Sequence, residues 1–248
     1  MSVYEYLVGV LREKGAGYLP LLDPDRLDGK RLVQMAARLE ASGVDALMVG
    51  SSLLLSATMD GIIRAIKEEV SLPVIVFPGS LNQVSKYADA ILFLSLISGR
   101  NPDRLIGDQV KAAPAIKEYD VEPISTGYML IDSGQTTSAQ FMSNTVPIPR
   151  DKPDIAMAHA LAAEYLGMKM VYLEAGSGAD QSVPEKTIAS VRGYVSIPLI
   201  VGGGIRTPEV AARKVKAGAS FIVTGNVLEK EGGLGLVEEF CSAIHSHP

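Results

Sequence analysis

The sequence contains a single cysteine, Cys241, among its 248 residues. One thiol cannot form an intrachain disulfide framework, which excludes the small disulfide-stapled secreted folds and fits a cytoplasmic protein. Long apolar runs are also missing, since no stretch reaches the ~18 consecutive apolar residues that a membrane-spanning helix needs. The N-terminus carries Glu5 and lacks the basic-then-apolar pattern of a secretory signal. We therefore expect a cytoplasmic chain without an integral membrane segment, and transient contact with a membrane is left open.

Positive charge is also in short supply. The chain has 23 Lys and Arg against 28 Asp and Glu, which gives a net charge of −5. With no basic cluster, nucleic acid is not expected as a partner. A phosphorylated small molecule stays compatible with this charge, because backbone dipoles and a metal ion can hold phosphate without a basic surface.

Short apolar segments alternate with helical patterns along the whole chain, and 47% of the residues are hydrophobic. Nearly continuous apolar segments are typical of parallel strands buried on both faces; the predicted strands cover residues 18–22, 45–49, 73–77, 90–94, 122–131, 171–174, 199–201 and 221–223. The predicted helices cover residues 1–14, 31–42, 59–69, 80–87, 104–119, 154–166, 184–192, 208–217 and 234–245. The alternation, without a linker, predicts the α/β class and one (β/α)8 TIM-barrel domain over residues 1–248. An open doubly wound sheet is the alternative.

Three segments carry finer expectations. Pro114 predicts a kink or a break in its helix. Asp154 is expected to cap the following helix, with an apolar stripe formed by Ile155, Ala158, Leu161, Ala162 and Tyr165. The longest irregular segment, residues 132–151, has the length of a lid or a binding loop.

Three consecutive strands near the C-terminus each run into glycines. Val171–Glu174 leads into Gly176, Ser177 and Gly178; the next two strands lead into Gly203-Gly204 and Gly225-Asn226. Glycine adopts positive φ readily and lets amide N–H groups approach an anion. In (β/α)8 barrels the loops after the last strands often bind phosphate. We therefore expect one phosphate site built by the loops after strands 6, 7 and 8.

A few polar side chains stand at strand ends, where barrel active sites lie. Asp23 and Ser52 supply hard oxygen ligands for Mg²⁺, or else cap a turn and a helix. Glu174 ends an apolar strand and is a candidate base, a hydroxyl anchor or a partner for a lysine such as Lys152. His159 and His245, like the single cysteine, are given no catalytic role.

Taken together, five segments resemble the geranylgeranylglyceryl phosphate synthase family: Leu22–Asp25, Val49–Ser52, Tyr172–Ala179, Val201–Arg206 and Thr224–Asn226. The likeness extends from about residue 17 to residue 230, and the Tyr-Leu-Glu-Ala-Gly-Ser-Gly stretch is its most specific part. Ser98–Pro102 and Leu105–Gly107 resemble the larger, oligomeric subgroup.

This resemblance implies a Mg²⁺-dependent prenyltransferase of archaeal-type lipid biosynthesis. It would join the C3 hydroxyl of sn-glycerol 1-phosphate to a prenyl diphosphate, with geranylgeranyl diphosphate expected first, and would assemble as a homo-oligomer (dimer or hexamer). Asp23 and Ser52 would bind the metal, and Glu174 would be the catalytic base. The implied glycerol phosphate site consists of Tyr172, Leu173, Glu174, Ala175, Gly176, Ser177, Gly178, Gly203, Gly204, Gly225 and Asn226.

One departure concerns charge, because Leu21 stands where some relatives carry Lys. Arg150 and Lys152 are the candidates to neutralise phosphate or diphosphate instead. The prenyl tail needs an apolar groove, expected where Leu53–Leu55, Phe77 and Phe93 cluster. The alternative functions are another phosphate-binding barrel enzyme, such as a sugar-phosphate isomerase or synthase, a flavin mononucleotide oxidoreductase, and a non-catalytic phosphate-ligand-binding barrel.

Overall fold

The structure, a computed structural model, describes residues 1–55, 58–229 and 232–245. Its strands form one parallel sheet in the order β1-β9-β8-β7-β6-β5-β4-β3-β2. The strands are β1 (Gly17–Tyr18), β2 (Leu21–Leu22), β3 (Leu47–Val49), β4 (Val74–Val76), β5 (Ala90–Leu96), β6 (Glu122–Leu130), β7 (Met170–Glu174), β8 (Leu199–Gly202) and β9 (Phe221–Val223).

The sheet closes because β1 and β2 are two parts of the first predicted strand. β1 pairs with β9, and the Leu21 amide donates to the Thr224 carbonyl at 2.8 Å. β2 pairs with β3 on the other side, where the Met48 amide donates to the Pro20 carbonyl at 2.9 Å. Pro20 has no N–H, which explains the interruption between β1 and β2. Both edges of the sheet therefore meet on residues 17–22, and the predicted (β/α)8 barrel is confirmed.

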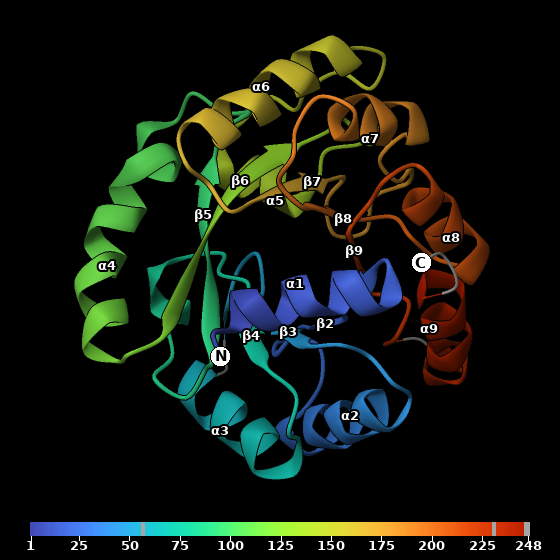
Figure 1. The fold of residues 1–248 in the computed structure, drawn as a ribbon. Helices are drawn as coiled ribbons and strands as arrows, with labels where there is room; N and C mark the ends of the chain where they lie inside the picture. The colour runs from blue at the N-terminus through green and yellow to red at the C-terminus, as the bar shows by residue number, and fades with distance from the viewer. Residues whose placement is uncertain (56–57, 230–231, 246–248) are drawn as a thin grey trace.

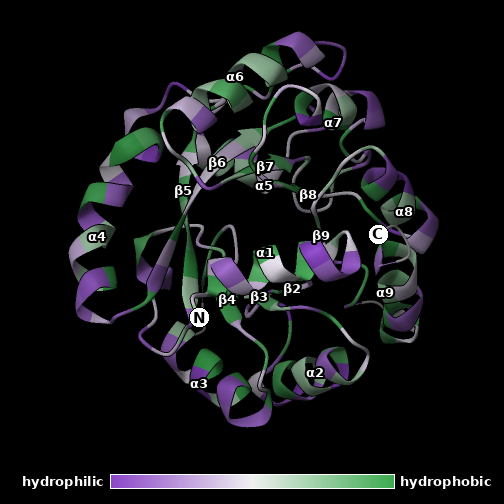
Figure 2. Ribbon diagram, in the orientation of Figure 1, coloured by the Kyte–Doolittle hydropathy of each residue, from purple (hydrophilic) through white to green (hydrophobic). Residues whose placement is uncertain are grey.

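Helices surround the strands as an outer ring (Figure 1). Hydrophilic residues face outward on α3 and α8 (Figure 2), as expected for helices that pack one face on a barrel. The helical segments are α1 (Val3–Lys14), α2 (Gly29–Ala41), α3 (Met59–Glu69), the 3₁₀ turn η1 (Leu81–Gln83), the π-helical turn η2 (Asp103–Gly107), α4 (Asp108–Glu118), α5 (Ser138–Ser143), α6 (Pro153–Tyr165), α7 (Glu185–Arg192), α8 (Pro208–Lys216), the 3₁₀ turn η3 (Gly233–Leu236) and α9 (Val237–His245).

Helix α6 differs from its prediction in both its cap and its buried face. Lys152 is its N-cap residue and Asp154 lies within the first turn, so the predicted Asp154 cap is wrong. Ile155 and Tyr165 are 37% and 80% exposed, whereas the buried face is formed by Ala156, Ala160 and Ala163. The helix lies very close to the sheet, since a Cβ added at Gly127 would be 2.9 Å from the Ala163 Cβ. Only small side chains fit between these two elements.

Two other segments also differ from expectation. Of the predicted kink or break at Pro114, the break does not occur, because α4 continues through this residue; the π-helical turn η2 precedes the helix. Residues 132–151 are not wholly irregular, because α5 forms within them behind the N-cap Thr137. Gln135 donates from Nε2 to the Gly178 carbonyl at 2.8 Å. The segment is therefore attached to one of the glycine loops.

The N-terminal ends of the strands are covered by α1, which crosses the barrel in Figure 1. Leu7 of α1 is fully buried and belongs to the same core cluster as Leu19 and Phe221. Asp45 accepts hydrogen bonds from Lys14 Nζ at 2.6 Å and from the Tyr18 amide at 2.7 Å, and its carboxylate lies 2.8 Å from the His245 ring. His245, given no role from the sequence, thus helps to tie α9 to this end of the barrel.

Candidate functional site

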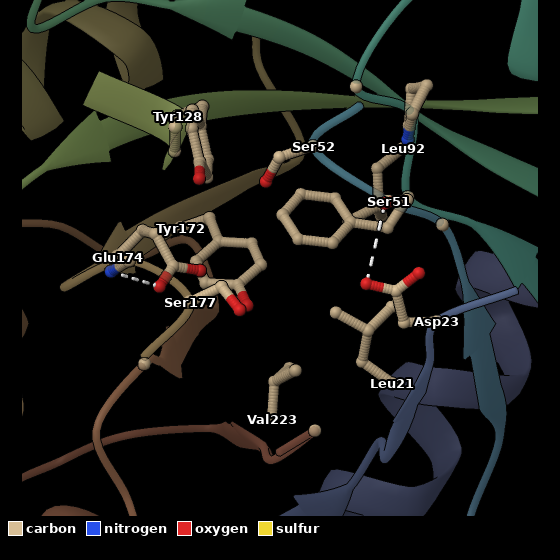
Figure 3. A pocket seen from close by; sticks show the side chains of 18 of the residues that line it. Leu21, Asp23, Ser51, Ser52, Leu92, Tyr128, Tyr172, Glu174, Ser177 and Val223 are labelled. Carbon is tan, nitrogen blue, oxygen red and sulfur yellow. Dashed lines mark hydrogen bonds between the residues drawn. The ribbon is translucent and has the colours of Figure 1, made fainter. Parts of the chain in front are cut away.

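A cavity of about 580 Å³ opens among the loops that follow the strands. Figure 3 shows Asp23 and Glu174 on opposite sides of it, with Tyr172 between them. Most of the predicted site residues line this cavity: Asp23, Ser52, Tyr172, Glu174, Gly176, Ser177, Gly178, Gly203, Gly204, Gly225 and Asn226. Leu173 and Ala175 do not, because they are buried in the core cluster beneath the outer helices. Their side chains therefore pack the barrel wall.

The three glycine loops form one cradle. Ser177 Oγ and Asn226 Oδ1 are 3.1 Å apart, which joins the loop after β7 to the loop after β9. Arg206 Nη2 donates to the Ala179 carbonyl at 2.7 Å, which joins the loop after β8 to the loop after β7. Several amides in these three loops donate no hydrogen bond to any described residue. They are the amides of Ser177, Gly178, Gly203, Gly204, Gly225 and Asn226. Donors of this kind, gathered around a cavity, form an anion site.

Gly203 marks a tight contact between two loops of the cradle. Its φ is +81°, and a Cβ there would lie 2.4 Å from Glu174 Oε1 and 2.7 Å from the Gly176 amide nitrogen. No side chain fits in that space without moving the carboxylate. The close approach of these two loops therefore depends on glycine at position 203.

Glu174 is a buried carboxylate at the end of β7, with only 5% of the residue exposed. Its Oε1 accepts a hydrogen bond from the Gly176 amide at 2.5 Å. Burial raises the pKa of Glu174 from the ordinary 4.5 to about 7, and the Gly176 amide and the Tyr172 hydroxyl offset this only in part. The suggested partner Lys152 is exposed at the start of α6. A carboxyl group with this pKa is suited to proton transfer near neutral pH.

Aromatic side chains form the wall next to Glu174. Phe77 stacks on Tyr172 with ring centroids 5.1 Å apart, and Tyr128 meets Tyr172 edge-on at 5.4 Å. Within the described ranges the Tyr172 hydroxyl is buried and lies near the Glu174 carboxylate, but it forms no hydrogen bond with it or with any other group. It is therefore a donor that a hydroxylated or anionic ligand would satisfy.

The remaining wall of the cavity is mostly apolar, although Arg104, Asp108 and Gln109 also belong to it. Its lining there includes Leu92, Phe93, Leu94, Leu96, Ala112, Ile116 and Met142. Phe77 and Phe93 line the cavity as predicted, whereas Leu53 and Leu55 are 50% and 78% exposed and are absent from its wall. After β4 the chain forms only the short turn η1, where a helix over residues 80–87 was expected. Ser80, Leu81 and Val84 of this short connection line the cavity, and η1 also contacts α4.

Asp23 lies at the opposite wall, after β2. Its Oδ2 is 3.4 Å from Ser51 Oγ, and the predicted second ligand, Ser52, also lines the cavity (Figure 3). Gln83, which is fully buried, donates from Nε2 to the Ser51 carbonyl at 2.7 Å and accepts from the Ser51 amide at 3.2 Å. Gln83 therefore fixes the chain that presents both hydroxyl groups to the cavity.

The basic residues proposed from the sequence lie elsewhere. Arg150 donates to the Asp132 carbonyl at 3.0 Å, and neither Arg150 nor Lys152 lines the cavity. The residue that sequence reasoning missed is Arg26, whose Nε is 3.3 Å from Asp23 Oδ2. Its position three residues after Asp23, in the same loop, was the available signal.

The closed barrel, the amide-lined cradle and the adjoining apolar compartment define a phosphate-binding (β/α)8 barrel with room for an apolar group. The chain belongs to the PcrB family, whose family model matches residues 8–245.

Relatives with established names support this membership. The chain is 49% identical over 226 residues to a geranylgeranylglyceryl phosphate synthase of Chitinophaga pinensis, covering 91% of this chain and 89% of the relative. It is 52% identical over 215 residues to a protein of the same name from Thermococcus gammatolerans, covering 86% and 84%.

Solved structures agree with this result. The structure superposes with a TM-score of 0.94 and 36% identity, over 99% of both chains, on the (S)-3-O-geranylgeranylglyceryl phosphate synthase of Thermoplasma acidophilum in complex with its substrate sn-glycerol-1-phosphate. An N-acetylmannosamine-6-phosphate 2-epimerase from Clostridium perfringens matches at a TM-score of 0.59 with 15% identity, and shows the shared fold alone.

Proposed function

We propose that the protein is a prenyltransferase that forms an ether bond between the C3 hydroxyl of sn-glycerol 1-phosphate and a prenyl diphosphate. One observation carries this conclusion: a buried carboxylate, Glu174, lies between a phosphate cradle and an apolar compartment. The Thermoplasma acidophilum structure, which holds sn-glycerol-1-phosphate, supports the assignment of the cradle to that substrate.

The cradle positions the nucleophile. Phosphate held by the amides of the three glycine loops leaves the glycerol carbons extending toward Glu174, whose Oε1 already borders Gly176 and Gly203. The C3 hydroxyl oxygen attacks C1 of the prenyl group while the Glu174 carboxylate takes its proton. The C1–O bond to diphosphate breaks, its electron pair leaves with the diphosphate, and the new C1–O bond completes the ether.

The leaving diphosphate belongs at the Asp23 wall. A carboxylate with neighbouring hydroxyls is a suitable donor set for Mg²⁺, which takes few protein ligands and completes its shell with water and substrate phosphate. Within the described ranges there is no cluster of three or more His, Cys, Asp or Glu side chains, so a cage built from protein ligands alone is not formed there. Asp23, with Ser51 or Ser52, would hold the ion. The metal would supply charge neutralisation of the leaving group.

The apolar compartment accommodates the prenyl tail. Burying some twenty carbons is worth on the order of 10 kcal/mol gross, at ~0.8 kcal/mol per CH₂, before the cost of ordering the chain. The rings of Phe77, Tyr128 and Tyr172 stand where the tail would meet the reacting carbon. A geranylgeranyl chain is the expected length.

The function is tested by incubating purified protein with radiolabelled sn-glycerol 1-phosphate, geranylgeranyl diphosphate and Mg²⁺. Label should move into an organic-extractable ether phosphate. Unlabelled sn-glycerol 3-phosphate should compete poorly, since its hydroxyls are placed differently relative to its phosphate. If the cradle binds the glycerol phosphate and no prenyl diphosphate of any length gives extractable label, the proposal is wrong.

The pH dependence of transfer follows from Glu174. Its base form is needed for proton removal, and its pKa is about 7. We expect kcat/KM to fall about tenfold per pH unit below 7 and to level off above pH ~8. A Glu174→Gln variant controls for titration of the substrate phosphate, because its residual rate keeps only that dependence. A profile for the unsubstituted chain that is flat between pH 5.5 and 8.5 would contradict the assignment.

The metal site is tested by a matched pair of variants. Asp23→Asn weakens the ligand that would hold Mg²⁺, and we expect turnover to fall by at least about 100-fold, with more Mg²⁺ needed for half-maximal rate. Asp28→Asn is the control, because Asp28 caps α2 at the surface and Asn caps a helix equally well. The measurement is the rate of each variant as a function of Mg²⁺ concentration. An equal loss of turnover in both variants would show that Asp23 is not a metal ligand.

Assembly and location complete the proposal. The family likeness supports a homo-oligomer, dimer or hexamer, which light scattering would measure. None of the helices in residues 1–55, 58–229 and 232–245 has the length and hydropathy of a membrane span. Cytoplasmic location stays a prediction, supported by the single cysteine.

A further inference from the structure

The cavity must balance two anions, a phosphate and a diphosphate, with few cations. Among the described residues only Arg104 and Arg206 contribute positive charge to its lining. Arg206 is engaged by the Ala179 and Asp180 carbonyls at 2.7 and 3.3 Å. Arg104 donates from Nη1 to the Gly79 carbonyl at 3.2 Å and to Asp108 at 2.9 Å. Both guanidinium groups are thus held by the protein itself.

Arg26 does not line the cavity itself, but it lies next to Asp23, which does, and it is held between two carboxylates. Its Nε is 3.3 Å from Asp23 Oδ2, and its Nη1 is 3.2 Å from Glu229 Oε2. Asp23 comes from the loop after β2, and Glu229 follows Gly225-Asn226 in the loop after β9. The Arg26 side chain is 44% exposed, so it can move. It therefore joins the loop that carries Asp23 to the loop that carries Gly225-Asn226.

A metal ion bound to Asp23 would compete with Arg26 for the carboxylate. If Asp23 held Mg²⁺, the positive ion would repel the Arg26 guanidinium from the same carboxylate. Glu229 is not a proposed metal ligand, so its contact with Arg26 has no such competitor. Arg26 also keeps N–H groups on Nη2 that have no partner among the described residues. A guanidinium presents its donors in a planar fork that matches phosphate oxygens.

We propose that Arg26 is the diphosphate-binding cation of this enzyme: anchored by Glu229, it turns from Asp23 to the leaving diphosphate when the metal takes Asp23. This inference rests on the proposed function and deepens it. As the prenyl C1–O bond breaks, the electron pair passes to the diphosphate oxygen, and the Arg26 N–H donors face that growing charge. Arg26 thereby supplies positive charge beside Asp23, where Leu21 supplies none.

The proposal predicts two effects of opposite sign, which calorimetry can measure without turnover. In Arg26→Gln, Mg²⁺ alone should bind about threefold more tightly, because its competitor for Asp23 is gone. Inorganic diphosphate in the presence of Mg²⁺ should bind roughly 10- to 100-fold more weakly, because charge-assisted hydrogen bonds are lost. Binding of sn-glycerol 1-phosphate should change by less than about twofold.

Arg31→Gln is the matched control. Arg31 also pairs with an aspartate three residues away, Asp28, but on the exposed start of α2. It should bind all three ligands as the unsubstituted chain does. If Arg26→Gln fails to fold, Glu229→Gln should still weaken diphosphate binding by a few fold, because the anchor is lost.

The inference is overturned if Arg26→Gln binds diphosphate normally, or if it weakens Mg²⁺, diphosphate and glycerol phosphate alike, as a merely structural role predicts. The inference and the proposed function fail separately. Arg26-dependent diphosphate binding without prenyl transfer would count against the transferase. Transfer that survives in Arg26→Gln with unchanged diphosphate affinity would count against Arg26.

Discussion

Replacing Glu174 by Gln should nearly abolish prenyl transfer and at the same time make the folded protein more stable at pH 8. Loss of a general base costs about 10²- to 10⁴-fold in rate. The glutamine side chain would keep the shape of the glutamate and could still accept the hydrogen bond from the Gly176 amide. Binding of sn-glycerol 1-phosphate should therefore change much less than turnover.

The gain in stability follows from proton linkage. Burial raises the folded-state pKa of Glu174 to about 7, above its ordinary 4.5. Between these two pH values the folded state holds a proton that the unfolded state has released, so stability falls as pH rises through this window. At pH 8 the charged, buried carboxylate costs about 3 kcal/mol, at ~1.4 kcal/mol per pKa unit, and Gln does not carry this cost. Near pH 4.5 the cost vanishes.

Chemical denaturation at pH 5 and pH 8 measures both effects. The stability of Glu174→Gln relative to the unsubstituted chain should increase by about 2–3 kcal/mol between these pH values. Glu209→Gln is the control, because Glu209 is fully exposed at the start of α8 and its pKa is lowered, mainly by a hydrogen bond with Thr207. It should show no such increase. A difference for Glu174→Gln that does not depend on pH would mean that the carboxyl group titrates normally.

Gly203→Ala should weaken glycerol phosphate binding about 100-fold. The added Cβ would lie 2.4 Å from Glu174 Oε1 and 2.7 Å from the Gly176 amide, so both the base and the cradle must move. Loss of two or three amide contacts to phosphate, at ~1–1.5 kcal/mol each, corresponds to about a 100-fold loss of affinity. Calorimetric titration with sn-glycerol 1-phosphate measures this directly.

Gly43→Ala separates backbone strain from contact with the site. Gly43 has φ +89°, close to the +81° of Gly203, but a Cβ there would meet nothing within 4 Å. Both variants should lose about 1–2 kcal/mol of stability, because Ala is strained at positive φ. Only Gly203→Ala should lose binding. Normal affinity in Gly203→Ala would show that phosphate binding does not depend on the close contact between these two loops.

The sequence predicts this fold well because its local patterns agree with one another. Short apolar strands, glycines at their ends and helices between them all indicate a parallel barrel, and the three glycine junctions do meet at one cavity. The split of the first strand at Pro20 changes the strand count and leaves the barrel closed. The hydrophobic periodicity of the sequence could not show that alanines form the buried face of α6. That face is selected by the close approach of Gly127 to Ala163, which is a tertiary contact.

The site is predicted less completely, for a related reason. Strand-end residues such as Asp23 and Glu174 are found because the barrel fixes where strands end. Charge partners are not found this way, because Arg150 turns to the Asp132 carbonyl and Arg26 turns to Asp23 through loop conformations that no periodic pattern encodes. Likewise, Ser51 is the hydroxyl nearest Asp23 in the structure, although Ser52 is the one named by resemblance.

The most direct test of the central claim follows the oxygen atom that becomes the ether. sn-Glycerol 1-phosphate carrying ¹⁸O at its C3 hydroxyl is incubated with the protein, geranylgeranyl diphosphate and Mg²⁺, and both products are analysed by mass spectrometry. Attack by the C3 oxygen on C1, with Glu174 taking the proton, predicts that all of the ¹⁸O is in the prenyl ether and none is in the released diphosphate. A product without ¹⁸O in its ether, or no ether at all under conditions where both substrates bind, would contradict it.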